Sequence, residues 1–225
     1  MMSALLKLIS LVFVAILRYA VGGSKLYPFG KDVGDSYLPV EDDKSSDTPI
    51  STPPFLFFGL NVNALYVHEN GLISFGSSLK DQTPSAFPLS GKAHAAAPYW
   101  ADVFTERGGR VWYRITTEED IISRATRDVM RAFPRYTRFN ANWVVIVTWN
   151  EVTFYGASGS HTQNRNTFQV LIASDGFMSF AGYIYDKLTW TSDTLNGAGE
   201  NGLGGKPPQV ISQLHSIISP GYKYI

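Results

Sequence analysis

The chain has 225 residues with 19 basic and 19 acidic side chains, so its formal net charge is zero. This balance provides no general attraction to nucleic acid or to an anionic membrane, and we expect neither as a partner. The chain has no cysteine but has 14 Phe, 12 Tyr and 5 Trp residues. A folded domain must therefore be stabilised by buried aromatic side chains and not by disulfides.

The first 22 residues have the pattern of a secretory signal peptide. Lys7 precedes an apolar run from 8 to 17, and Ala20 to Gly22 supply the small residues of a cleavage site. A retained membrane anchor is the alternative, but about ten apolar residues fall short of the roughly twenty that span a bilayer. We therefore expect residues 1–22 to be removed, and the mature chain to be secreted with no membrane-inserted segment.

The next segments predict a β-rich domain that starts with an irregular lead-in. Residues 24–54 are rich in Gly, Pro and acidic residues, which favour loops. Residues 64–68 and 72–75 have the composition of strands. They are joined through Asn70-Gly71, a pair that supplies the positive φ values of a type I′ turn. These residues predict a β-hairpin.

One amphipathic helix is predicted at about 118–133, after a short strand at 110–115. Apolar residues recur there at three-to-four spacing, and Pro134 ends the pattern. Thr116 or Thr117 stands three positions before an acidic residue, which is the spacing of a capping box. The other face of this helix is charged, so we expect it to cover one side of a sheet.

The richest strand signals lie in residues 143–155, 167–172 and 177–180, and the last two segments flank the turn sequence Ser-Asp-Gly at 174–176. Odd-numbered residues from Trp143 to Trp149 would share one face of a strand, and the residues between them the other. Because both faces are largely apolar, this strand is expected at the centre of two layers. The predicted fold class is mainly β, an antiparallel β-sandwich with one amphipathic helix.

The polar residues show no established catalytic pattern. Asp102, Glu106 and Glu151 are carboxylates near aromatic positions, but a glycosidase needs two such groups at a defined separation, which a sequence does not supply. The four histidines have no partner at i+4, and residues 156–160 lack the lysine of a phosphate-binding loop. We expect a non-catalytic domain without a cofactor.

Calcium is the ion for which the sequence offers ligands. Acidic residues of the lead-in could supply oxygen atoms, although their spacing is not that of an EF-hand. A solvated acidic loop is the alternative interpretation. The residues concerned are Asp32, Asp35, Glu41, Asp42 and Asp43.

An ordered series of motifs runs from residue 26 to residue 205. It comprises Leu-Tyr-Pro-Phe-Gly at 26–30, the hairpin at 67–75, Ala-Pro-Tyr-Trp-Ala-Asp-Val at 97–103, the strands at 143–156 and 166–171, and Gly-Leu-Gly-Gly at 202–205. In this order and spacing the motifs resemble the nidogen-like (NIDO) domain family, and most of all its α-tectorin type. The resemblance implies a non-catalytic extracellular-matrix or cell-surface module involved in cell–matrix adhesion, with matrix or cell-surface proteins as partners.

Residues 206–225 depart from the family pattern, and we expect a divergent tail that lacks the last strand. An open sheet edge would then be available for association of the chain with itself. Loops are the best place to seek other partner contacts, and the candidates are Tyr155, His161 and Arg165. The alternative function is that of a carbohydrate-binding extracellular module with exposed aromatic rings as stacking platforms.

Overall fold

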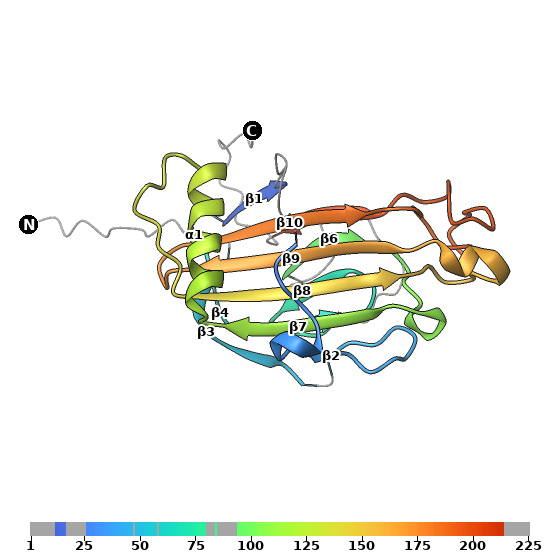
Figure 1. Cartoon of the computed structure of the whole chain (residues 1–225), viewed down its shortest axis with the longest axis horizontal. Coiled ribbons are helices and arrows are strands. Elements are labelled where there is room, and N and C mark those ends of the chain that lie inside the picture. The colour runs from blue at the N-terminus through green and yellow to red at the C-terminus, as the bar shows by residue number, and fades with distance from the viewer. Residues whose placement is uncertain are drawn as a thin grey trace, which may run out of the picture.

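The computed structural model describes the backbone of residues 12–16, 26–46, 48–57, 59–79, 84 and 94–213. In these residues the chain forms two β-sheets packed face to face, with one α-helix on the outer face of the larger sheet (Figure 1). This arrangement confirms the mainly β class, the sandwich and the single helix. No helix in the described residues is long and apolar enough to cross a membrane.

The larger sheet has six strands in the order β1-β10-β9-β8-β7-β2. Their bounds are β1 (Val12–Ile16), β2 (Ser36–Tyr37), β7 (Arg110–Thr116), β8 (Trp143–Val152), β9 (Asn166–Ser174) and β10 (Ser179–Lys187). All neighbours are antiparallel except β1, which pairs in parallel with β10. The β9–β10 hairpin confirms the turn predicted at 174–176. Strand β1 lies inside the predicted signal peptide, the rest of which is outside the described residues.

The smaller sheet has five antiparallel strands in the order β11-β6-β5-β4-β3. Their bounds are β3 (Ile50–Phe57), β4 (Leu60–His68), β5 (Leu72–Phe75), β6 (His94–Trp100) and β11 (Gln209–Gln213). Strand β11 belongs to the segment from 206 onward, in which we expected a missing strand, and it covers the edge of β6. The tail beyond residue 213 lies outside the described residues.

Strand β8 is central, as the alternation of its residues predicted. Trp143, Val145, Val147 and Trp149 belong to the core between the two sheets. Val144 and Ile146 belong to a second core under the helix. Both faces of β8 are therefore buried, and its neighbours β7 and β9 extend the same two-sided packing.

The helix α1 spans Glu119–Ala132, close to the predicted range, and ends just before Pro134. The capping box predicted at its start is wrong. Its N-cap residue is Glu118, which makes no side-chain capping bond, and the hydroxyl of Thr116 accepts a hydrogen bond only from the Glu118 N–H, at 3.1 Å. Thr116 ends β7, so it is held by the sheet and not at the helix terminus.

The turn between β4 and β5 has three residues, Glu69 to Gly71, and is not of type I′. Only Gly71 has a positive φ, of 80°, whereas a type I′ turn needs two such residues. The side chain of Asn70 is engaged elsewhere: it donates to Asp43 Oδ1 at 2.8 Å and accepts from the Val103 N–H at 2.8 Å. These contacts with two other loops stabilise the longer turn.

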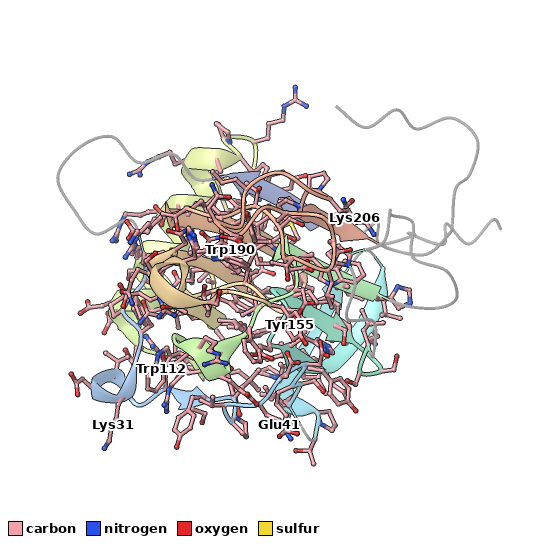
Figure 2. The ribbon with its side chains drawn as sticks, turned by 90° about the vertical axis from the view of Figure 1, so that its right-hand side faces the viewer. Lys31, Glu41, Trp112, Tyr155, Trp190 and Lys206 are labelled. Carbon is pink, nitrogen blue, oxygen red and sulfur yellow. The ribbon has the colours of Figure 1, made fainter. Side chains whose placement is uncertain are left out.

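Loops gather at one end of the sandwich, which Figure 2 views directly. They comprise residues 38–46, 101–109, 153–165 and 188–208, and they include the short 3-10 helices η2 (Thr105–Arg107) and η3 (Gly159–Gln163); a third, η1 (Lys31–Val33), precedes β2. Backbone hydrogen bonds connect these loops, among them Tyr155 N–H to the Asp102 carbonyl at 3.0 Å and Thr194 N–H to the Tyr155 carbonyl at 3.2 Å. We call this region the loop end.

Candidate functional site

Three carboxylates from two distant parts of the chain meet at the loop end. Asp42 and Asp43 come from the loop after β2, and Asp102 follows β6. One oxygen atom of each lies within 4.8 Å of the other two. Asp102 is only 8% exposed, whereas Asp43 is open to solvent. We call these three residues the acidic cluster.

The turn between β4 and β5 positions the acidic cluster. Asn70 connects Asp43 with the backbone of Val103, next to Asp102. Glu69 fixes the same two loops, because its carboxylate accepts the backbone N–H of Thr105 at 2.7 Å and that of Lys44 at 3.3 Å. Two consecutive turn residues therefore align the loops from which the three carboxylates come.

The carboxylate of Asp102 has no compensating partner. Within the described residues it accepts no hydrogen bond and forms no ion pair, although its own backbone carbonyl accepts the Tyr155 N–H. The Oδ1 atom of Asp42 is also buried and has no hydrogen-bond partner among those residues. Buried polar atoms are almost always paired in folded proteins, so the unpaired Oδ1 atom of Asp42 requires an explanation.

The electrostatics of the site favour binding of a cation. Burial, together with smaller contributions from repulsion by Asp193 and by the other two members of the cluster, raises the pKa of Asp102 to about 8. Burial is also the main cause that raises the pKa of Asp42, of Asp43 and of Glu69, the last to about 7. Hydrogen bonds lower the pKa values of Asp42, Asp43 and Glu69 in part, but no basic side chain of the described residues lowers any of the four.

Of the five acidic residues that the sequence offered for calcium, only Asp42 and Asp43 lie in the cluster. Asp35 instead forms a buried ion pair with Arg114, at 2.6 Å, and accepts the Gly30 N–H at 2.7 Å. Glu41 pairs with Lys44 at 3.0 Å. The fifth residue, Asp32, is exposed in η1.

The third carboxylate of the cluster, Asp102, entered the sequence analysis as a catalytic candidate with Glu106 and Glu151. Both glutamates are exposed, and neither belongs to the acidic cluster. Glu151 occupies a bulge in β8, with a φ of 49°. The local signal for Asp102 was its position directly after a strongly apolar strand, where a carboxylate is partly withdrawn from water.

The candidate partner-contact residues also lie at the loop end. Tyr155 is half-buried, with its ring edge-on to Phe104 at 5.2 Å (Figure 2). His161 lies in η3. Arg165 is engaged within the domain, because its guanidinium donates to the carbonyls of Arg107 at 3.0 Å and Glu151 at 3.3 Å.

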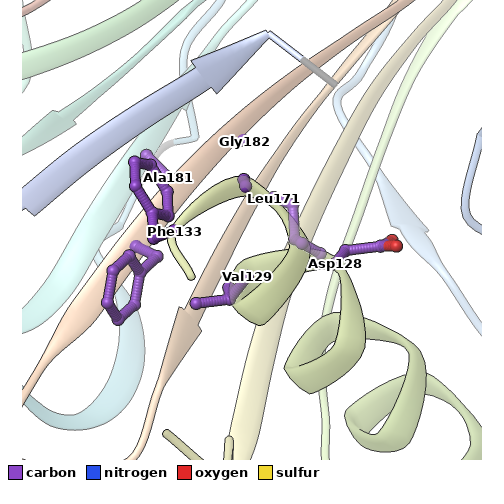
Figure 3. A pocket seen from close by; sticks show the side chains of 8 residues that line it. Asp128, Val129, Phe133, Leu171, Ala181 and Gly182 are labelled. Carbon is purple, nitrogen blue, oxygen red and sulfur yellow. The ribbon is translucent and has the colours of Figure 1, made fainter. Parts of the chain in front are cut away.

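A small pocket lies elsewhere, between α1 and the strands β9 and β10 (Figure 3). Its lining is mainly apolar and includes Val129, Phe133 and Leu171. The polar residue on its wall, Asp128, accepts a hydrogen bond from the Tyr27 hydroxyl at 2.8 Å and pairs with Arg124 at 3.6 Å. The pocket therefore offers no uncommitted polar group for chemistry.

The sequence of the chain is similar to those of known proteins. A sequence profile of the family described as nidogen-like domain matches residues 63–211. Mouse alpha-tectorin is 40% identical over 206 residues, which cover 90% of this chain and 9% of the relative. The chain belongs to the nidogen-like (NIDO) domain family. Mouse nidogen-2 is 31% identical over 191 residues, covering 79% of this chain and 13% of that protein. No solved structure matches the chain.

This NIDO domain spans about a tenth of the length of its alpha-tectorin relatives. Alpha-tectorin and the nidogens are structural proteins of the extracellular matrix and are secreted. The chain is therefore an extracellular-matrix module that is secreted to the matrix or the cell surface.

Proposed function

We propose that this NIDO domain contributes to cell–matrix adhesion by binding matrix or cell-surface proteins, and that it catalyses no reaction. The observation that carries the proposal is the pattern of coverage: nine-tenths of this chain aligns with only 9% of alpha-tectorin. A domain that recurs as one part of much longer matrix proteins is suited to contribute one contact surface among many.

The loop end is the surface on which we propose the partner binds. Besides Tyr155, His161 and Arg165, it carries Leu195 and Leu203, whose side chains are 75% and 49% exposed. The loop that contains both leucines is hydrogen-bonded to Tyr155. Apolar residues next to an amphipathic aromatic side chain are typical of the central part of a protein interface.

A matrix-retention assay tests this proposal. The secreted, tagged chain would be applied to cell-free extracellular matrix, and retention compared with that of the double variant Leu195→Asp, Leu203→Asp. Phe177→Asp is the matched control, because Phe177 is 72% exposed and lies in the β9–β10 turn at the other end of the sandwich. We expect the leucine variant to lose at least about tenfold in retention. Equal losses in the two variants, or wild-type retention no greater than that of an unrelated protein, would refute it.

One observation favours carbohydrate binding as the second candidate function. Tyr37 is 51% exposed and packs edge-on against Trp112 at 5.6 Å on the outer edge of the larger sheet. However, Arg110 lies 4.6 Å from the centre of the Tyr37 ring and occupies a face that a sugar would need. Retention on immobilised glycans that free sugar blocks and that Tyr37→Ser abolishes would favour this alternative.

We also propose that the chain associates with itself, but through a different sheet edge from the one that the sequence indicated. Strand β11 covers β6, but β1 lies within the proposed signal peptide, residues 1–22. Removal of that segment would leave β10 at the edge of the larger sheet with unpaired backbone groups, which can pair with a second copy. Amino-terminal sequencing of the secreted chain tests the cleavage, and sedimentation of the same sample tests the association.

A further inference from the structure

We propose that Asp42, Asp43 and Asp102 bind a calcium ion that joins the loop after β2 to the loop after β6. The site would lie at the loop end, beside the surface proposed for partner binding. Calcium binding there would not depend on which partner that surface binds.

The spacing of the three carboxylates fits a single cation. Calcium lies about 2.3–2.6 Å from each oxygen ligand, so two ligands on opposite sides of the ion are about 5 Å apart at most. One oxygen atom from each of Asp42, Asp43 and Asp102 lies within 4.8 Å of the other two. One ion can therefore reach all three carboxylates without a rearrangement of the loops.

The state of Asp102 is an independent indication of a ligand. The residue is only 8% exposed, one of its carboxylate oxygen atoms points into the cluster, and the carboxylate has neither a hydrogen-bond donor nor a basic partner within the described residues. A buried carboxylate is costly unless it is paired or coordinates a metal. The buried Oδ1 atom of Asp42, which also lacks a partner there, has the same requirement.

The chemistry of the donors selects calcium. The cluster consists of carboxylates alone, and hard cations such as calcium and magnesium prefer oxygen ligands. Magnesium requires a nearly ideal octahedron and keeps several water molecules, whereas calcium accepts six to eight oxygen atoms in irregular geometry. Ligands that come from two loops and differ in burial suit calcium better. The secreted location supplies calcium at concentrations that sites of about 10⁻⁴–10⁻³ M affinity can use.

Residues next to the cluster hold the ligands in place and do not themselves bind the ion. Asn70 donates to one oxygen atom of Asp43, which leaves the other oxygen free to coordinate. The carboxylate of Glu69 is occupied by the backbone N–H groups of Thr105 and Lys44. Asp193 accepts two hydrogen bonds from Asn196, at 2.9 and 2.7 Å. Asn70 and Glu69 thus form an ordered support for the ligands, whereas Asp193 is engaged within its own loop.

The test is calcium titration of the full secreted chain after treatment with a chelator, by calorimetry and by thermal unfolding. At pH 7.5, 10 mM calcium should raise the melting temperature by about 3–10 °C, given the affinity expected of an extracellular site. Magnesium at the same concentration should have a smaller effect. No heat and no shift with calcium, or an equal shift with magnesium, would overturn the proposal.

Two isosteric variants separate metal binding from folding. Asp102→Asn and Asp43→Asn keep the side-chain shape, so both should fold, but each should weaken calcium binding at least about tenfold. Asp32→Asn is the matched control: Asp32 lies in the same lead-in, is exposed and is outside the cluster. It should respond to calcium as the wild type does. A full calcium response in both Asp102→Asn and Asp43→Asn would show that the ion binds elsewhere.

Discussion

Truncation of Trp149 is the sharpest test of how the two sheets are held together. This side chain is fully buried and stacks on Phe168, with ring centres 5.0 Å apart and an angle of 14° between the planes. Its indole N–H donates to the backbone carbonyls of His68, at 3.1 Å, and Glu69, at 2.8 Å. His68 is the last residue of β4 in the opposite sheet, and Glu69 follows it. Trp149 therefore contributes both packing and a polar contact between the layers.

The two contributions can be estimated separately. Trp149→Ala should cost about 3–5 kcal/mol for the lost contacts and the cavity, and about 1 kcal/mol more for the lost hydrogen bond. In a domain of this size, such a loss lowers the melting temperature by about 10–20 °C. Trp149→Phe keeps an aromatic ring against Phe168 but removes the N–H, so it should cost about 1–3 kcal/mol.

Urea and thermal unfolding, followed by circular dichroism in buffer without metal ions, would measure these losses. Trp112→Ala is the control, because Trp112 lies half-buried on the outer face of the larger sheet. It should cost about 1 kcal/mol. The reasoning fails if Trp149→Ala unfolds within about 1 kcal/mol of the wild type, or if Trp149→Phe is as damaging as Trp149→Ala.

Three further perturbations test other parts of the structure. In metal-free buffer, Asp102 of the folded chain holds its proton up to a pKa of about 8, whereas the unfolded chain releases it near 4. The free energy of unfolding, measured with urea, should therefore fall as the pH rises from 4 to 8. A flat profile would contradict the raised pKa. Gly71→Ala would place a Cβ 1.9 Å from the Tyr99 carbonyl oxygen at a φ of 80°, so it should lower the free energy of unfolding by at least about 2 kcal/mol, and by more than Gly76→Ala, whose Cβ meets nothing within 4 Å. Deletion of 206–225 removes β11 and exposes β6, so the secreted yield and the melting temperature should both fall; unchanged values would show that β11 contributes nothing to the sheet.

The strands and the helix could be predicted because their signals are local. Alternation from Trp143 to Trp149 reports burial on both faces of one strand, and no distant residue is needed to interpret it. The start of α1 shows the limit of local patterns, since the hydroxyl of Thr116 has the spacing of a cap but belongs to β7. Tertiary structure determines which of two local patterns is realised.

The acidic cluster could not be predicted in this way, because its members are far apart in the chain. Asp42 and Asp102 are brought together by the sheets and by Asn70, whose role depends on contacts with two loops. Loops have no periodicity that records which of their side chains are buried. The sequence identified Asp42 and Asp43 as possible ligands, but the third ligand required the fold.

The β4–β5 turn connects this site with the core. Glu69 accepts the indole N–H of Trp149 on its carbonyl and holds both loops of the acidic cluster with its carboxylate. Asn70, the next residue, binds Asp43 and the backbone after Asp102. Because the same two residues contact the core and the cluster, an ion that fixes the cluster also restrains the turn on which Trp149 is anchored. Calcium should therefore raise the stability of the whole sandwich, and not only the order of its loops.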